Sequence, residues 1–159
     1  MVPVDQLIIP AARKGETAVL EELIRQHADI DMRDEKGYTP LIIACYNNQY
    51  AAAKLLLENG ANVNAADAGG NTALMGVSFK GYADIASLLI EQGADLNLQH
   101  GNGGSALMFA AMFGRNDVLK LLLANGADKT LVDSRGLSVL DLAIQQNNQE
   151  AIALLHSMQ

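Results

Sequence analysis

The sequence is poor in several residues on which specialised classes of protein depend. It contains one cysteine, three prolines and no tryptophan, and none of its apolar runs approaches the ~18 residues that a membrane-spanning helix needs. Because a single cysteine cannot form an internal disulfide, the disulfide frameworks of small secreted domains are excluded. We therefore expect a single domain over residues 1–159, with no membrane partner.

Basic residues are also scarce. Lys and Arg number 11 against 18 Asp and Glu, which gives a net charge of −7 and an isoelectric point near 4.8. Binding to nucleic acid depends on clustered basic side chains that displace counterions from the phosphates, so nucleic acid is excluded as a partner. The first residues, MVPVDQLIIPAA, lack the basic start of a signal peptide. We expect a cytoplasmic protein, or a periplasmic one if a leader had been removed.

A 33-residue period is the strongest pattern present. Steps of 33 from Asp34 reach Asp67, His100 and Asp133 without an insertion or deletion. Three further positions repeat with the same spacing, and their residues are Gly37, Gly70, Gly103 and Gly136, then Thr39, Thr72, Ser105 and Ser138, then Leu41, Leu74, Leu107 and Leu140. A fixed period of this length is typical of stacked structural units. The period predicts units at about 1–33, 34–66, 67–99, 100–132 and 133–159.

Each position of the unit has a physical role. The repeated glycine favours positive φ in a tight turn, and the hydroxyl two residues later can cap a helix that Pro40 begins. Small residues follow at Ala11, Ala44, Val77, Ala110 and Ala143, where first helices of neighbouring units can approach closely. Second helices carry apolar stripes such as DIASLLI and end at Gly60, Gly93 and Gly126. Polar residues on the first and last units predict capping repeats.

The pattern G-x-T-P-L…A…LL…GA-[DN]-x-N, clearest in GYTPLIIACYNNQYAAAKLLLENGANVNAAD, resembles the ankyrin repeat over essentially the whole chain. The resemblance implies an all-α solenoid of five helix-turn-helix units joined by β-turn or hairpin loops. One departure stands out: the histidine that usually follows the family's T-P-L is replaced by Ile9, Ile42, Met75, Met108 and Asp141. The hydrogen bond that this histidine makes between units should therefore be missing, and apolar contact should take its place.

Few residues suggest a catalytic, nucleotide-binding or metal-binding site. GNGGSA, from Gly101 to Ala106, matches a dinucleotide-binding loop, but Gly103 belongs to the repeated turn, so a nucleotide-handling enzyme is the less favoured alternative. The three histidines and Cys45 lack metal-ligand spacing, and Cys45 aligns with small residues at a packed position. We expect no enzyme, no cofactor, no metal and no catalytic residue. Gly76, which aligns with Phe109, is interpreted as a gap filled by that ring.

The resemblance also implies a binding surface, because ankyrin repeats usually hold partner proteins at the turn tips and at the exposed ends of the first helices. Tyr46, Phe79, Met112 and Phe113 should form an apolar ribbon across units two to four. The full set of candidate partner-binding residues is Arg13, Lys14, Glu35, Lys36, Tyr38, Tyr46, Asn47, Asn71, Phe79, Lys80, Asn102, Met112, Phe113, Gln145 and Gln146.

These residues predict a non-enzymatic protein-binding module that is monomeric when unbound. Arg13, Lys14 and Lys80 would make the groove neutral to mildly basic, which suits an apolar partner with some acidic groups; a basic partner would favour the acidic back and turn tips. Likeness to small bacterial ankyrin proteins implies an inhibitory, immunity-like role or an accessory role beside a stress enzyme such as a catalase. A self-assembling structural protein is a further alternative.

Overall fold

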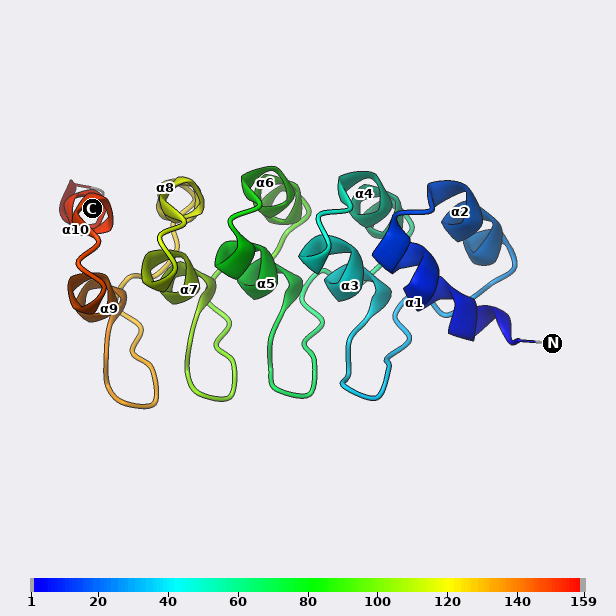
Figure 1. Cartoon of the computed structure of the whole chain (residues 1–159), viewed down its shortest axis with the longest axis horizontal. Coiled ribbons are helices and arrows are strands. Elements are labelled where there is room, and N and C mark those ends of the chain that lie inside the picture. Colours follow the sequence, from blue (N-terminus) through cyan, green and yellow to red (C-terminus); the bar gives the residue numbers. More distant parts are fainter. Residues whose placement is uncertain (1, 158–159) are drawn as a thin grey trace.

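The computed structural model describes residues 2–157, which form paired helices joined by loops and no β-strand. The first helices of the pairs are α1 (Val4–Lys14), α3 (Pro40–Tyr46), α5 (Ala73–Lys80), α7 (Ala106–Met112) and α9 (Val139–Gln145). The second helices are α2 (Thr17–Arg25), α4 (Tyr50–Glu58), α6 (Ala83–Glu91), α8 (Asn116–Ala124) and α10 (Gln149–Ser157). The pairs stand in one row with the chain ends at opposite ends, and the long turns project from one edge (Figure 1). The all-α solenoid is confirmed.

The repeated turns have the predicted backbone. Gly37, Gly70, Gly103 and Gly136 all have positive φ, between 81° and 85°. In the second unit Oδ1 of Asp34 accepts hydrogen bonds from the backbone N–H groups of Lys36 and Tyr38, each at 2.9 Å. The fourth unit has a histidine at this position, and Nδ1 of His100 accepts the N–H groups of Asn102 and Gly104 instead. The turn therefore needs an acceptor at its first residue, and an imidazole nitrogen can supply it.

The hydroxyl caps are also confirmed. The side chains of Thr39, Thr72, Ser105 and Ser138 each accept a hydrogen bond from the backbone N–H three residues on, and Pro40 is the first residue of α3. Two residues that replace the family's histidine complete such a cap, since Sδ of Met75 accepts the N–H of Thr72 and the carboxylate of Asp141 accepts that of Ser138. These side chains therefore serve the helix start of their own unit.

The core is a continuous strip between neighbouring units. The predicted small residues Ala11, Ala44, Val77, Ala110 and Ala143 are all buried, which lets the first helices pack closely. Leu56, Leu89 and Leu122 are fully buried in the second helices. Each first helix contacts the first helix of the next unit, from α1 to α9, and each second helix contacts the second helix of the next unit, from α2 to α10. The stability of the fold thus depends on junctions between adjacent units.

Side chains at the start of the loops also join the units. Oδ1 of Asp31 accepts the backbone N–H of Asn62 at 3.0 Å, and one unit later Oδ1 of Asn64 accepts that of Asp95 at 2.8 Å. Asn97 repeats the contact with the N–H of Asp128, also at 2.8 Å. Because these donors lie in neighbouring units, the [DN]-x-N pattern encodes a hydrogen-bonded ladder along the stack.

The end units leave apolar positions uncovered. Leu7 and Val19 on the first unit are exposed, although their equivalents in later units are buried. Ile144 on the last unit is 56% exposed, whereas the aligned Cys45 and Ala111 are fully buried. The polar residues that predict capping therefore share the end surfaces with some apolar side chains.

Candidate functional site

The apolar ribbon exists as a chain of touching rings. The rings of Tyr46, at the end of α3, and Phe79, on α5, are nearly parallel, with centroids 6.4 Å apart and an angle of 6° between their planes. Phe79 meets Phe113, just after α7, edge to face at 4.6 Å. Met112 is half-buried beside Phe113 and packs against the core. Three consecutive units are thereby linked by side chains at one surface.

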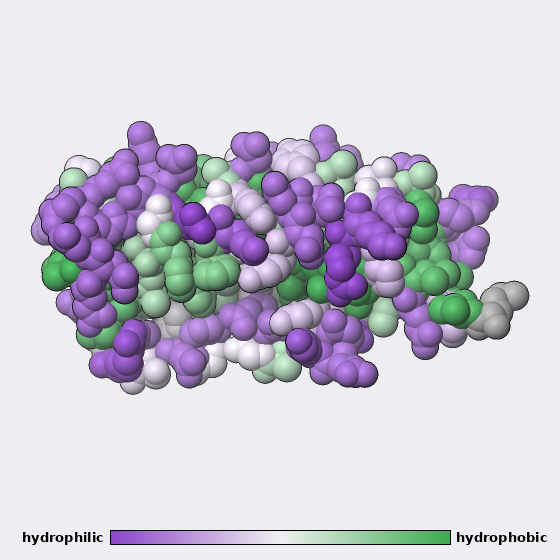
Figure 2. Space-filling model, viewed as in Figure 1, coloured by the Kyte–Doolittle hydropathy of each residue, from purple (hydrophilic) through white to green (hydrophobic). Residues whose placement is uncertain are grey.

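Two rings of the ribbon are well exposed to solvent. Tyr46 is 42% exposed and Phe113 43%, while Phe79 between them is half-buried. Nζ of Lys80 lies 4.7 Å from the centroid of the Tyr46 ring, within the range of a cation–π contact. In Figure 2, hydrophobic surface shows in the middle band at the level of the first helices, and hydrophilic residues dominate the edge formed by the turns. The ribbon is thus ordered by its own contacts and still open to a partner.

The other candidate residues fall into two groups. At the ends of first helices, Arg13, Lys14, Gln145 and Gln146 are exposed, and the exposed Asn47 donates from Nδ2 to the carbonyl oxygen of Ile43. Near the turns, Glu35, Lys36 and Asn102 are exposed at the tips, whereas Tyr38 and Asn71 are half-buried beside the helix caps. The structure brings Tyr38, Asn71, Tyr46 and Phe79 together around one pocket. The residues of the first and last units lie outside it.

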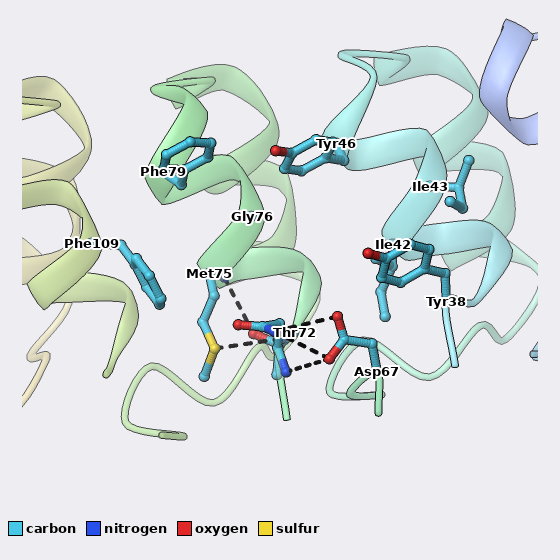
Figure 3. Close-up of a pocket in the computed structure, with 11 residues that line it drawn as sticks. Tyr38, Ile42, Ile43, Tyr46, Asp67, Thr72, Met75, Gly76, Phe79 and Phe109 are labelled. Atoms are coloured by element: carbon cyan, nitrogen blue, oxygen red, sulfur yellow. Dashed lines mark hydrogen bonds between the residues drawn. The ribbon is translucent and has the colours of Figure 1, made fainter. Parts of the chain in front are cut away.

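That pocket lies between α3 and α5 and has a volume of about 330 Å³. Tyr38, Ile42, Ile43 and Tyr46 line it from one unit, and Thr72, Met75, Gly76 and Phe79 line it from the next. In Figure 3 the rings of Tyr46 and Phe79 stand at its upper edge, and Asp67, with the Thr72 segment, closes the lower edge. Sequence reasoning did not identify this pocket, which we call the Gly76 pocket.

Gly76 leaves one position of the pocket wall without a side chain. Gly76 occupies the helix position that Ile43, Phe109 and Leu142 fill in other units. A methyl group on Gly76 would lie 3.2 Å from Cδ1 of Tyr46, and no atom of Phe109 is among the nearest neighbours of that point. The interpretation that Phe109 fills the gap is therefore wrong: the ring beside Gly76 comes from Tyr46 of the preceding unit, whereas Phe109 lines the same pocket farther from Gly76 (Figure 3).

One charged residue, Asp67, lines the Gly76 pocket. Its Oδ1 accepts the backbone N–H groups of Gly69 and Asn71, both at 2.9 Å, as the turn requires. Its Oδ2 has one long contact, 3.4 Å from Nδ2 of Asn71, within the described residues 2–157. The equivalent Asp133 differs, because Arg135 pairs with its Oδ2 at 2.8 Å and holds the pKa of that carboxyl below its usual value.

The glycine-rich loop after α6 uses its own polar groups. The N–H of Gly101 donates to the carbonyl oxygen of Gly69, that of Gly103 to the carbonyl oxygen of His100, and those of Asn102 and Gly104 to Nδ1 of His100. A phosphate cradle depends on backbone N–H groups that are free to point at the ligand. Binding of a nucleotide at Gly101–Ala106 would therefore first have to break this turn.

Cys45 is fully buried at the packed position that the alignment with Ala12 and Ala111 predicted. Burial raises the pKa of its thiol from the ordinary 9.0 to about 12. Because the thiolate is the reactive form, this cysteine is a poor nucleophile near neutral pH. Within residues 2–157 no three His, Cys, Asp or Glu side chains are arranged to hold a metal ion. None of the helices in this range combines the length and hydropathy needed to cross a bilayer.

Comparison with known proteins supports the architecture. A search among curated proteins found no similar sequence. A family model described as ankyrin repeats in three copies matches residues 8–100 and again residues 75–158. The two matches together cover nearly the whole row of helix pairs, including the Gly76 pocket and the apolar ribbon. Members of this family are generally protein–protein interaction modules and are typically not enzymes. The chain belongs to the ankyrin repeat family.

Proposed function

We propose that this protein binds a partner protein through the apolar ribbon, with the neighbouring turn tips flanking the contact. The observation that carries the proposal is the unbroken ring contact from Tyr46 through Phe79 to Phe113, across three units, with both end rings more than 40% exposed. Single exposed apolar side chains are common on proteins, but contiguous ones mark interaction sites. The ribbon is contiguous, which sets it apart from the isolated exposed Tyr50.

Order within the ribbon favours binding. Each ring already rests on a neighbour, and Lys80 lies over Tyr46, so docking would immobilise few additional rotamers. Aromatic anchors in protein interfaces can each contribute about 2 kcal/mol or more. A ribbon of three such rings is enough for a specific complex if the partner presents apolar side chains along the same line.

The biological role is a further step that the ribbon does not determine. An inhibitory role toward a toxin-like effector and an accessory role beside a stress enzyme both need a partner protein, and both are predictions from the family resemblance. The identity of a partner that depends on the ribbon would choose between them. Self-assembly would require that the partner be a second copy of this chain.

The test is affinity capture from the source cell with three baits: wild type, the triple variant Tyr46→Ala, Phe79→Ala, Phe113→Ala, and Tyr50→Ala. Tyr50, on α4, is 43% exposed and so matches Tyr46 and Phe113 in the surface that truncation removes. We expect one protein to be captured by wild type and Tyr50→Ala and lost with the triple variant, whose helix content is checked by circular dichroism. Equal capture by all three baits would place recognition outside the ribbon.

A further inference from the structure

We propose that the Gly76 pocket takes one apolar side chain of the partner whose neighbouring residue is a Lys or Arg that pairs with Asp67. This inference rests on the proposed function and gives it a specific chemistry. It combines an apolar opening between two neighbouring units with an oxygen of Asp67 at its edge that makes one long contact.

The Gly76 pocket lies at the junction of α3 and α5, and a second opening of about 410 Å³ lies at the equivalent junction of α7 and α9, where Leu142 takes the place of Gly76. Ile43, Phe109 and Leu142 put large side chains at the equivalent helix position, and Gly76 alone of this series has none. The opening of about 330 Å³ is large enough for a Leu, Met or Phe side chain but not for a folded domain. A partner can therefore enter it with a single side chain, while the ribbon at the upper edge holds the surrounding surface.

The walls suit an apolar group. Ile42, Ile43 and Met75 are buried side chains that line this opening, and the rings of Tyr46 and Phe79 border it. Withdrawing an apolar side chain from water into such a site is favourable. A polar side chain would lose its hydration there and find few partners, because Asp67 and Thr72 lie together at one edge (Figure 3), where Nδ2 of Asn71 donates to Asp67.

The charge at that edge selects the neighbouring residue. The turn of the third unit, which begins at Asp67, has Gly69 as its third residue. The turns of the second, fourth and fifth units have Lys36, Asn102 and Arg135 at that position. Asp133 uses its arginine as a partner for Oδ2, and Gly69 offers Asp67 no such group. A Lys or Arg beside the inserted side chain would supply the missing cation, and an acidic residue there would be repelled.

The test uses two-dimensional ¹H–¹⁵N NMR of the whole chain with blocked dipeptides at about 10 mM. N-acetyl-Leu-Arg amide is the probe, and N-acetyl-Leu-Glu amide and N-acetyl-Ser-Arg amide are its controls. We expect the probe to shift the amide signals of Thr72, Gly76 and Phe79, with affinity at least about threefold above that of either control, as a partly exposed charge pair permits. No shift at these amides, or equal shifts with all three dipeptides, would overturn the proposal.

Variants separate the two parts of the site. Gly76→Leu restores the side chain that other units have and should abolish the shifts. Asp67→Asn keeps an oxygen for the turn hydrogen bonds but removes the charge, so it should equalise the affinities for the Arg and Glu dipeptides. Asp133→Asn makes the same change in a turn that does not line the pocket and should leave the preference intact. A preference that survives Asp67→Asn would refute the role of that carboxylate.

Failure of this inference can be told apart from failure of the proposed function. If the triple ribbon variant loses the captured protein but Gly76→Leu and Asp67→Asn retain it at wild-type levels, the ribbon binds the partner and the pocket proposal is wrong. If the probe binds the pocket but capture does not depend on the ribbon, the proposed function is wrong, and the assignment of the pocket to a segment of that partner fails with it. Loss of capture with Gly76→Leu, together with the dipeptide preference, supports both.

Discussion

The ring of Tyr46 lies against Gly76 of the next unit so closely that a methyl group on Gly76 would come within 3.2 Å of Cδ1. A helix interior is an unfavourable place for glycine, at a cost of about 1 kcal/mol relative to alanine. Tyr46 is exposed and sits at the end of α3, so its ring can move by a few tenths of an ångström. The glycine thus makes room for the ring of Tyr46 at the expense of local stability.

We therefore predict that Gly76→Ala raises the free energy of unfolding, by up to about 1 kcal/mol. Urea unfolding followed by circular dichroism would measure it, since the chain has no tryptophan to report by fluorescence. In a Tyr46→Ala background, where the ring no longer crowds this position, Gly76→Ala should raise the free energy of unfolding by at least as much. A loss of stability in both backgrounds would show that contacts other than Tyr46 exclude a side chain at this position.

The second prediction concerns His100, which accepts two backbone N–H groups where other turns use Asp. His100→Ala removes both acceptors and the edge-to-face contact with Phe109, whose centroid is 5.1 Å away, so it should cost about 1–3 kcal/mol. His100→Asp restores the acceptors without the ring and should recover a large part of the loss. Urea midpoints of the three proteins test this, and an alanine variant as stable as wild type would contradict it.

The third prediction follows from the raised pKa of Cys45, about 12 in the folded protein against 9.0 ordinarily. Below pH 9 both states hold the thiol proton, so the contribution of this group to stability is fully present; it is lost as the pH rises from about 9 toward 12. At about pH 10.5 the loss should be on the order of 1–2 kcal/mol relative to Cys45→Ala, which titrates the same other groups. Unfolding of both proteins at about pH 8 and 10.5 measures the difference.

Reactivity gives an independent check on the same thiol. Native protein at about pH 8 should react very slowly with iodoacetamide, and unfolding in urea should restore the ordinary rate. Rapid alkylation of the native protein would mean that Cys45 is accessible, which would contradict its complete burial.

The fourth prediction tests the hydrogen-bonded ladder. Asn64→Ala removes the acceptor for the backbone N–H of Asp95 and should cost about 1 kcal/mol or somewhat more. Asn64→Asp keeps an oxygen in the same place, as Asp31 does one unit earlier, so its free energy of unfolding should be close to that of wild type. Thermal or urea unfolding would separate them; equal losses for both variants would show that the amide nitrogen of Asn64, rather than its oxygen, matters.

Local rules explain why so much of the fold could be predicted. The turn glycines, the hydroxyl caps and the glycines that follow α4, α6 and α8 act within a few residues of themselves, so their roles can be inferred from spacing alone. The structure confirms each of them at the predicted positions.

The site was less predictable because it depends on rotamers across unit boundaries. The 33-residue spacing aligns Phe79 with Met112, but the ring that Phe79 touches belongs to Phe113. The same spacing aligns Gly76 with Phe109 and so suggested the wrong ring as its neighbour. One signal was available: Gly76 stands where Ile43, Phe109 and Leu142 stand in other units, and such an interruption marks a place where a neighbouring ring can lie against the helix.

The row of helix pairs has a mechanical consequence, because each pair packs against its immediate neighbours. The curvature of the whole molecule is the sum of small angles at the junctions, and bending can be shared among them without breaking any one. A ligand that touches Tyr46, Phe79 and Phe113 together would span the α3–α5 and α5–α7 junctions and limit bending at both. The complex would therefore bend less than the free protein. The bending that remains would occur at the junctions with the first and last units.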